Sequence, residues 1–551
     1  MESSIDMTER DLLQMDPELA DQIAPHRAEF IARGLWTEER LGSQVSVHAK
    51  VNPQREAVVD RKGCRRVSFV ELDRLSNQFA GWLAANGMGE GDIIAVQLPN
   101  CLEAVVIAVG ANKAGVAVNP MLTIYRGNEL RHNLSLTRAK AIFVPGLYRG
   151  FDHEALAGQI SAELEHAPRV EVVEVTDDDE EGPQAWLDAL GDWPAHPPTV
   201  KPPASDVSVI LFTSGTTGKP KAVMHTEQTL NSNVRSVWRS FEMGDDETVW
   251  MPSPVGHSSG FGFGIRIALL HGASLVLQDR WNPKLAVELI ESERPTYTLA
   301  ATVFLTDILR LADNHNSDIS SLRVFGCGGA PVPAGVVKAA ARYGINVLRL
   351  YGQSETQVAT QNYFSSPLQK RIYTDGQAVE GFNAEIRDAR GERLPAGVEG
   401  ELCVTGPGMS VGYYKDRQRT LDKFRDGWAH TGDLAVMDDD GYITIVGRQS
   451  DMIIRGGLNI APREIEEAIE RLESVVAAVI VGLPHDRLGE YGCACVVPEP
   501  GARPTLDDIC DHLRTLGFAA FKLPERIELL DELPSTASGK IQRHELVAKF
   551  S

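Results

Sequence analysis

A run rich in glycine, hydroxyl and lysine residues, TSGTTGKPK, follows an apolar segment and precedes a run compatible with a helix. Glycine lets the backbone approach an anion closely, and hydroxyl and ammonium groups supply the donors and positive charge that a polyphosphate needs. The run is not a Walker P-loop, because Gly215 and Gly218 are too close together and Pro220 follows the lysine. Alone, it is equally compatible with an ordinary turn. The residues it offers to a polyphosphate are Thr213, Ser214, Gly215, Thr216, Thr217, Gly218, Lys219 and Lys221.

A second string, GHSSG at Gly256 to Gly260, matches the G-x-S-x-G nucleophile elbow of serine hydrolases and follows the apolar segment TVWMPSPV. Such a pentapeptide is common by chance, so the hydrolase remains a remote alternative. His257 is equally compatible with a loop histidine that bonds to the backbone.

Four further strings carry hydroxyl, carboxylate and basic groups in a fixed order. They are YGQSET (Tyr351 to Thr356), HTGD (His430 to Asp433), GRQSD (Gly447 to Asp451) and TASGK (Thr536 to Lys540). Together with TSGTTGKPK they resemble the adenylate-forming superfamily of acyl-CoA synthetases, aryl acid ligases, nonribosomal adenylation domains and luciferases. The resemblance runs from about Val58 to Lys540, nearly the whole chain.

The resemblance implies an α/β fold with a large N-terminal domain of two sheet-and-helix lobes plus a β-subdomain. A small, mobile α+β domain follows at the C-terminus. We expect residues 1–449 to form the N-terminal domain, with a linker at about 177–205, and residues 450–551 to form the C-terminal domain. Acidic residues at 177–181 and the proline cluster at 194–203 mark the linker, after which Val207 to Thr213 is expected to begin a second α/β unit.

The resemblance also implies roles for single residues. The loop from Thr213 to Lys221 would hold the β- and γ-phosphates of ATP, and Glu355 would ligate Mg²⁺. The residues expected to contact adenine, ribose or the α-phosphate are Gly328, Gly329, Ala330, Tyr351, Gly352, Thr356, Asp433 and Arg448. Lys540 would bridge the carboxylate and phosphate during adenylation and then be exchanged for the loop of Arg455, Gly456, Gly457 and Leu458. Relatives carry Asp or Lys at the hinge, where this chain has Ser450.

The reaction implied is ATP-dependent activation of a carboxylic acid to acyl-AMP, followed by transfer to CoA, with ATP, Mg²⁺ and CoA as cofactors. His257 would lie near the carboxylate, in a wall of the acyl pocket. The segment HSSGFGFG lacks the acidic residue that amino-acid-activating relatives place there, so a neutral, largely apolar acid is expected. An acyl-AMP ligase that loads a carrier-protein thiol remains the alternative, and a nucleotide sensor is disfavoured because Lys540 and Glu355 are both present.

Hydrophobic periodicity predicts the elements that position these motifs. Apolar residues from Phe69 to Trp82 recur every three or four residues and stop at Gly87, as in an amphipathic helix. Ile93 to Pro99 and Lys140 to Pro145 are strand-like, and Cys101 to Val118 predicts a buried helix leading to a strand. The alternation favours a parallel sheet wrapped by helices.

Composition limits the function classes. With a formal charge of −22 the chain repels phosphate backbones and anionic lipids, so nucleic-acid and membrane-surface binders are excluded. Seven cysteines, without two pairs at metal-ligand spacing, are typical of buried thiols in a reducing compartment. No signal peptide or membrane span is recognised, so a cytoplasmic enzyme is expected, as a monomer or homodimer.

Overall fold

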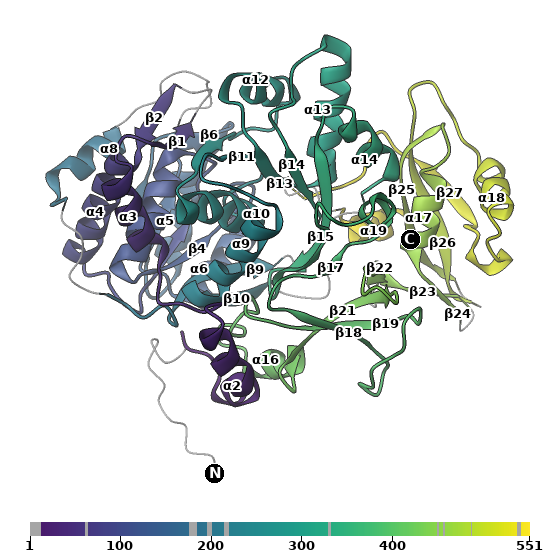
Figure 1. Cartoon of the computed structure of the whole chain (residues 1–551), viewed down its shortest axis with the longest axis horizontal. Helices are drawn as coiled ribbons and strands as arrows, with labels where there is room; N and C mark the ends of the chain where they lie inside the picture. Colours follow the sequence, from purple (N-terminus) through teal and green to yellow (C-terminus); the bar gives the residue numbers. More distant parts are fainter. Residues whose placement is uncertain are drawn as a thin grey trace.

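The computed structural model describes residues 13–60, 64–175, 185–195, 201–213, 220–328, 332–448, 451–455, 458–485, 488–536 and 541–551. The chain forms two sheet-and-helix lobes, a β-subdomain and a smaller C-terminal unit, which confirms the expected fold class (Figure 1). Among the described residues, no helix combines the length and apolar composition that crossing a membrane requires.

The first lobe is built on a six-stranded sheet in the order β10-β9-β4-β3-β5-β8. Its strands are β3 (Ile93–Val96), β4 (Ala117–Pro120), β5 (Ala141–Val144), β8 (Arg169–Val172), β9 (Val207–Thr213) and β10 (Lys221–Thr226). Strand β9 has the predicted bounds but pairs in parallel with β4, through Val118 and Val209. The expectation that it begins a second α/β unit is therefore wrong, because the chain returns after the linker to extend the first sheet.

Helices cover this sheet. They are α3 (Leu41–Val51), α4 (Phe69–Ala85), α5 (Leu102–Ala114), α6 (Gly127–Thr137), α7 (His153–Glu163) and α8 (Ala185–Ala189), with the 3-10 turn η1 (Leu190–Asp192) and the small hairpin β6 (Leu147–Tyr148) and β7 (Phe151–Asp152). Helix α4 begins with a capping box between Ser68 and Glu71, and every residue of α5 is buried. Helix α4 confirms the predicted apolar periodicity, and α5 confirms the buried helix predicted from the apolar stretch after Cys101.

The segment after the glycine-rich loop is a strand and not a helix. Residues of β10 pair antiparallel with β9, with Lys221 opposite Thr213, so the strands before and after the loop form a β-hairpin. The predicted helix begins only at α9 (Glu227–Ser240). Alanine, valine and methionine of β10 are buried in the sheet, and this tertiary burial outweighs their compatibility with a helix.

The second lobe has a nine-stranded sheet in the order β17-β16-β15-β14-β13-β11-β12-β1-β2. Its strands are β1 (Glu56–Asp60), β2 (Arg65–Ser68), β11 (Thr248–Met251), β12 (Ser274–Leu277), β13 (Tyr297–Ala300), β14 (Val324–Cys327), β15 (Asn346–Gln353), β16 (Gln357–Gln361) and β17 (Gln377–Ala378). Its helical segments are α10 (Ser258–Gly260), the π-helical turn η2 (Phe261–Arg266), α11 (Ile267–His271), α12 (Pro283–Glu293), α13 (Thr302–His315), α14 (Ala334–Ala341) and α15 (Leu368–Tyr373). Strands β1 and β2 come from the start of the chain, so the two lobes are interleaved in sequence.

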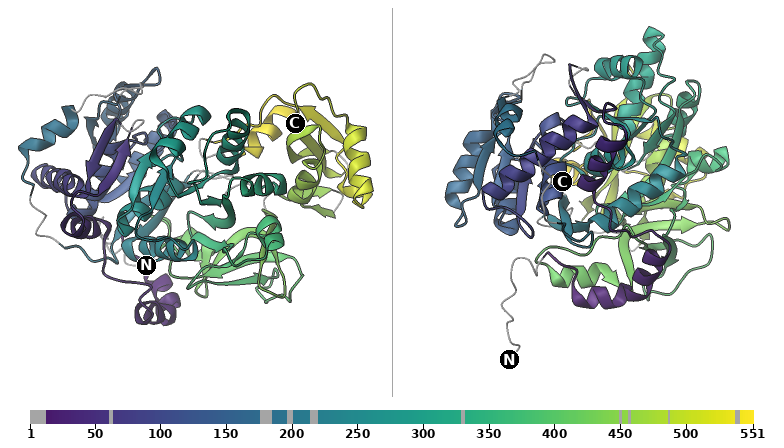
Figure 2. Two further views of the ribbon diagram at one scale, coloured as in Figure 1. Left: turned by 45° about the horizontal axis from the view of Figure 1, so that its top comes forward. Right: turned by 60° about the vertical axis from the view of Figure 1, so that its left-hand side comes forward.

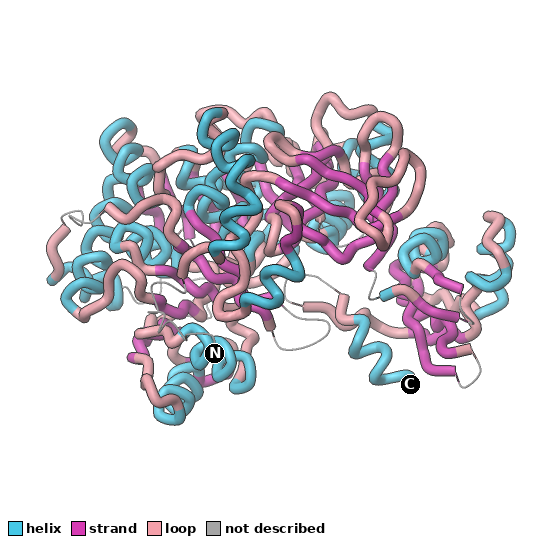
Figure 3. Tube along the Cα trace, turned by 90° about the horizontal axis from the view of Figure 1, so that it is seen from below, coloured by secondary structure: helices cyan, strands magenta, loops and turns pink. Residues whose placement is uncertain are grey.

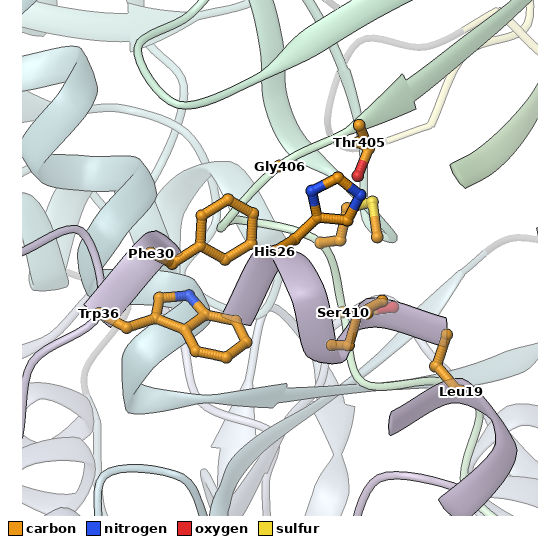
Figure 4. Close-up of a pocket in the computed structure, with 9 residues that line it drawn as sticks. Leu19, His26, Phe30, Trp36, Thr405, Gly406 and Ser410 are labelled. Atoms are coloured by element: carbon orange, nitrogen blue, oxygen red, sulfur yellow. The ribbon is translucent and has the colours of Figure 1, made fainter. Parts of the chain in front are cut away.

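The β-subdomain contains β18 (Asn383–Arg387), β19 (Gly400–Thr405), β20 (Phe424–Arg425), β21 (Trp428–Met437) and β22 (Ile443–Arg448), with helix α16 (Arg417–Lys423). Helix α2 (Pro17–Ala32) lies beside it (Figure 1). His26, Phe30 and Trp36 face Thr405 and Gly406 across a small pocket (Figure 4). The indole Nε1 of Trp36 donates to the carbonyl oxygen of Pro407 at 2.8 Å, which ties the N-terminal segment to this loop.

The residues after Arg448 form their own sheet, in the order β24-β23-β26-β25 with β27 beside β26. The elements are β23 (Ile453–Arg455), β24 (Leu458–Ile460), α17 (Pro462–Ile469), β25 (Val475–His485), β26 (Gly489–Pro498), α18 (Leu506–Thr515), the 3-10 turn η4 (Ala520–Lys522), β27 (Arg526–Leu529) and α19 (Arg543–Phe550). This C-terminal unit lies to one side of the lobes (Figures 2 and 3).

Candidate active site

Polar side chains from the second lobe and the β-subdomain meet around Asp433. Tyr351 and Gln353 lie two residues apart near the end of β15, so their side chains project from the same face of the strand. Asp433 of β21 is paired with Arg448 of β22, which places these two residues next to each other across the hairpin. We call Tyr351, Gln353, Asp433, Arg448 and Lys423 the Asp433 cluster.

Three donors hold the Asp433 carboxylate. Its Oδ2 accepts from Tyr351 Oη at 2.5 Å and from Gln353 Nε2 at 2.6 Å, and Arg448 Nε lies 3.2 Å from Oδ1. Burial raises the pKa of the Tyr351 hydroxyl, and the neighbouring carboxylate raises it further, so the phenol stays a donor. Asp433 is therefore fixed as an acceptor at the junction of two strands, as the predicted ribose contact requires.

Glu355 lies close by and is buried. Burial alone would raise the pKa of its carboxyl group, but Lys423 and a hydrogen bond from Tyr413 hold that pKa below its ordinary value. The Tyr413 Oη donates to Glu355 Oε1 at 2.7 Å. An ionised carboxylate is the hard oxygen ligand that Mg²⁺ prefers, so Glu355 fits the predicted metal role.

The backbone around Glu355 is fixed from the other side as well. Ser410 N donates to the Glu355 carbonyl oxygen at 2.8 Å. Ser410 also lines the small pocket under α2, so packing of the N-terminal helix supports the segment that carries Glu355 (Figure 4).

The two described residues that flank the glycine-rich loop, Thr213 and Lys221, lie near Tyr413 and Glu355. Thr213 and Lys221 pair at the loop end of the β9–β10 hairpin, and the Lys221 ammonium lies 5.4 Å from the centroid of the Tyr413 ring. Because Tyr413 bonds to Glu355, the loop begins and ends next to the candidate metal ligand. The other predicted residues of the site lie outside the described residues: Ser214, Gly215, Thr216, Thr217, Gly218, Lys219, Gly329, Ala330, Gly456, Gly457 and Lys540.

The placement of Thr356 does not support its predicted contact with the α-phosphate. Its side chain is fully buried, and its hydroxyl donates to the Gln357 carbonyl oxygen at 3.3 Å and accepts from Gln353 N at 3.4 Å. Ser354, two residues earlier, is partly exposed. The burial of Thr356 accompanies a turn at this point, where Gln357 takes a φ of 54° and is itself buried.

Two predicted nucleotide-binding glycines are required by close packing. A Cβ at Gly352 would lie 2.0 Å from the Gln357 carbonyl oxygen, and one at Gly328 would lie 2.6 Å from that of Leu350. No other residue type fits there without moving the backbone. These glycines therefore shape the edge of the site.

The GHSSG string does not form a nucleophile elbow. Strand β11 ends at Met251, and Ser258 begins α10 only after residues 252–257, whereas the elbow requires a sharp strand-to-helix turn. A Cβ at Gly256 would lie 2.3 Å from the Met121 carbonyl oxygen, so packing accounts for this glycine. His257 Nδ1 lies 2.9 Å from the Oγ of Ser259. The serine at the nucleophile position of the motif would be Ser258.

Among Gly260, Gly262 and Gly264, only Gly262 could carry a Cβ without a clash. A Cβ there would meet Gln357 Oε1 at 3.5 Å, an ordinary contact. At Gly260 it would lie 2.2 Å from the Pro254 carbonyl oxygen, and at Gly264 it would lie 2.5 Å from Met251 Cγ. Behind this segment is a small pocket with apolar walls, lined among others by Ala104, Ala108, Val118, Phe261 and Ile265.

Sequence reasoning missed three residues of the site. Gln353 lies inside the quoted YGQSET string and shares the strand face of Tyr351, so strand alternation could have found it. Tyr413 and Lys423 lie in none of the quoted strings. Only the tertiary fold brings Tyr413 to Glu355 and Lys423 to Gln353.

A neighbouring group, Glu401, Cys403 and His430, supports the HTGD segment. His430 Nδ1 lies 3.0 Å from Glu401 Oε2, and the other oxygen of Glu401 accepts from Gly432 N at 3.0 Å. Burial raises the pKa of the Cys403 thiol to about 12. This group therefore fixes the backbone directly before Asp433.

Known proteins resemble this chain over most of its length. Residues 45–414 match the AMP-binding enzyme family, and residues 464–540 match the AMP-binding enzyme C-terminal domain. The chain is 33% identical over 525 residues to a medium-chain fatty-acid–CoA ligase of Escherichia coli, covering 94% of this chain and 91% of that protein. It is 31% identical to a feruloyl-CoA synthase of Amycolatopsis, covering 93% and 99% of the two chains. The crystal structure of ATP-bound MatB from Rhodopseudomonas palustris superposes with a TM-score of 0.82 at 28% identity, covering 92% of this chain and 99% of that one.

Proposed function

The chain belongs to the AMP-binding enzyme family, and from this premise we propose how its residues divide the work of the reaction. The protein is an AMP-forming acid:CoA ligase. It joins a carboxylate to the α-phosphorus of ATP with release of pyrophosphate, and then transfers the acyl group to the thiol of CoA. ATP, Mg²⁺ and CoA are its cofactors.

The observation that carries the assignment of residues is the Asp433 carboxylate, held by three donors. Oδ2 already accepts from Tyr351 and Gln353. Within the part of the chain that the structure describes, Oδ1 contacts only Arg448, so an acceptor position on Oδ1 is open to a ribose hydroxyl. We assign Asp433 and Arg448 to the ribose. Tyr351, with Gly328, Gly329 and Ala330, is assigned to adenine.

Glu355 is proposed to hold Mg²⁺, which neutralises charge on the phosphates when bound. Thr213, Lys221 and the loop between them are proposed to bind the β- and γ-phosphates. For the α-phosphate we propose Ser354 in place of Thr356, because Ser354 is partly exposed and Thr356 is fully buried.

The chemistry requires that two anions meet. Carboxylate and triphosphate repel each other, so positioning and charge neutralisation supply most of the rate enhancement. We propose that Lys540 bridges the two groups during adenylation and leaves before CoA enters. The proposed moving unit is residues 450–551, rotating against residues 1–449. Its separate sheet and its position to one side of the lobes support this division (Figure 3).

The acid is proposed to be neutral and largely apolar. The stretch from His257 to Gly264 offers small and aromatic side chains and no carboxylate, which supports an aliphatic or ring-containing chain. The E. coli relative is named for medium-chain fatty acids and the Amycolatopsis relative for feruloyl-CoA. We also propose a reducing, cytoplasmic compartment, which the predominantly buried cysteines support.

The test is pyrophosphate release with a panel of straight-chain, alicyclic and aromatic acids, with and without CoA. We expect thioester formation with CoA for a neutral apolar acid and rejection of amino acids, whose ammonium group would be buried without a partner. Acid-dependent pyrophosphate release without any thioester would instead indicate a carrier-protein acceptor.

A further inference from the structure

Lys423 places a positive charge inside the nucleotide site from an unexpected part of the chain. It is the last residue of α16. Its Nζ donates to Gln353 Oε1 at 2.8 Å and to the Thr431 carbonyl oxygen at 3.2 Å. Neither partner is charged.

Burying this ammonium group costs stability, because its desolvation is only partly compensated. Burial lowers the pKa of Lys423, and the charges of Glu355 and Asp433 oppose that shift. Among the described residues, no carboxylate oxygen comes within ion-pair distance of its Nζ. A stabilising surface ion pair therefore does not explain the position of this lysine.

The hydrogen bonds around Gln353 show what Lys423 does. An ammonium group can only donate, so the amide oxygen of Gln353 must face Lys423. The amide nitrogen then faces the other way, where it donates to Asp433 Oδ2 at 2.6 Å and to the Thr431 carbonyl oxygen at 2.9 Å. If the amide were reversed, its oxygen would lie against the carboxylate and its nitrogen against the ammonium, and both contacts would be repulsive.

We propose that Lys423 is a positioning residue for ribose recognition: through Gln353 it fixes the Asp433 carboxylate in the orientation that binds the ribose hydroxyls. The proposal rests on the ribose role assigned to Asp433 above. It adds a residue that lies outside all the motifs that identify the family, and a path of two hydrogen bonds, from Lys423 to Gln353 and from Gln353 to Asp433.

The proposal predicts a change in nucleotide preference and not only a loss of rate. The measurement is kcat/KM for ATP and for 2′-deoxy-ATP in the full ligase reaction. In Lys423→Met the preference for ATP should fall about tenfold, the scale of one hydrogen bond to a charged group. Lys423→Arg, which keeps the donor and the charge, should keep the preference within about threefold of the wild type. An equal loss with both nucleotides in Lys423→Met would overturn the proposal.

A double-variant cycle tests the path. If Lys423 acts through Gln353, then Gln353→Leu should lower the preference similarly, and adding Lys423→Met to it should lower the preference little further. Full additivity of the two changes would contradict an action through Gln353.

Two controls separate the possible causes. Lys370→Met removes another lysine near the β-subdomain, one that pairs with Asp438 and Asp440 at the β21–β22 turn, and should leave the preference unchanged. Asp433→Ala should abolish the preference. If Asp433→Ala kept it, the ribose role of Asp433 would be wrong and this proposal would fall with it. If only Lys423→Met kept it, the ribose role would stand and the proposal for Lys423 alone would fail. Tryptophan fluorescence checks that each variant is folded.

Discussion

The Asp433 cluster and the C-terminal unit, which we propose act on the same substrates, are held in different ways. In the cluster, hydrogen bonds from β15 and α16 and the pairing of β21 with β22 fix each side chain before any ligand binds. Among the described residues, one ion pair joins the C-terminal unit to the lobes, between Arg463 of α17 and Asp375, with Nη2 and Oδ2 3.5 Å apart. The difference suggests a division of labour, in which a rigid region recognises the nucleotide and a loosely attached region brings and removes catalytic groups.

The largest effect is expected from Lys540, which tests this division directly. Lys540→Ala should reduce acid-dependent pyrophosphate release by at least about 100-fold, because it removes the ammonium group that we propose bridges the carboxylate and the α-phosphate as charge builds between them. Supplied acyl-adenylate plus CoA should still give thioester at near the wild-type rate. If both half-reactions fell equally in a folded variant, the two-conformation scheme would be wrong.

The two regions should also respond to pH in opposite directions. Burial lowers the pKa of His271 in the lobes to about 4, so its contribution to stability is complete above pH 6.5 and is lost as the pH falls through 4. Burial raises the pKa of Glu470 in α17's C-terminal turn to about 7, so its contribution is complete below pH 4.5 and is lost as the pH rises through 7. Each amounts to roughly 3 kcal/mol at 1.36 kcal/mol per pKa unit.

The measurement uses the distribution of tryptophans. All eight lie at or before Trp428, and Trp238 stacks on His271 with centroids 4.3 Å apart, so fluorescence reports on the lobes and the β-subdomain and not on the C-terminal unit. Urea unfolding followed by fluorescence should show destabilisation from pH 7 to 5, while hydrogen exchange in peptides after residue 450 should slow. Glu470→Gln should remove the second trend and leave the first. Parallel trends in both regions would refute the prediction.

Asp433→Ala should weaken both half-reactions, in contrast to Lys540→Ala. The ribose is present in ATP and in the acyl-adenylate, so losing its acceptor should cost about 1.5–3 kcal/mol in kcat/KM for each. The matched control is Asp440→Ala, which removes an exposed carboxylate from the β21–β22 turn. If Asp433→Ala used ATP as well as the wild type does, the Asp433 cluster would not recognise the nucleotide, and the proposed division of labour would be wrong.

Acid recognition is expected to belong to the lobes alone. Gly262→Leu should lower kcat/KM for bulky acids by roughly 1–3 kcal/mol more than for acetate or propionate, because a Cβ fits at Gly262 without a clash and the leucine side chain beyond it is expected to displace part of the acyl chain. A uniform loss across the acid series would show that this segment does not line the acyl pocket. Substitution at Gly260 or Gly264 is unsuitable for the test, since a Cβ there meets the Pro254 backbone or the Met251 side chain.

The smallest effect is expected at the contact between the two regions. Arg463→Ala removes the ion pair with Asp375, which keeps its bond to Arg349 Nη2 at 2.9 Å. The domain arrangement of this structure should then be less populated. The ratio of the rates of the two half-reactions should change by about threefold to fivefold, which is about 1 kcal/mol. Stopped-flow measurement of the two half-reactions gives the ratio. An unchanged ratio would show that this ion pair does not bias the domain arrangement.

The sequence by itself determined the chemistry and much of the local structure. The ordered strings around Glu355, Asp433 and Lys540 indicated adenylate formation, and the comparisons confirmed the family. The apolar runs gave β9 its bounds and predicted α4 and α5, because periodicity and capping act between residues close together in the chain.

Only the tertiary structure decided which of these residues meet. Gln353 reaches Asp433 across 80 residues and Lys423 across 70, and β9 joins a sheet begun a hundred residues earlier. The same packing turns Thr356 inward and makes β10 a strand. Local patterns cannot specify such contacts, because burial and long-range strand pairing outweigh the weak preference of any single segment.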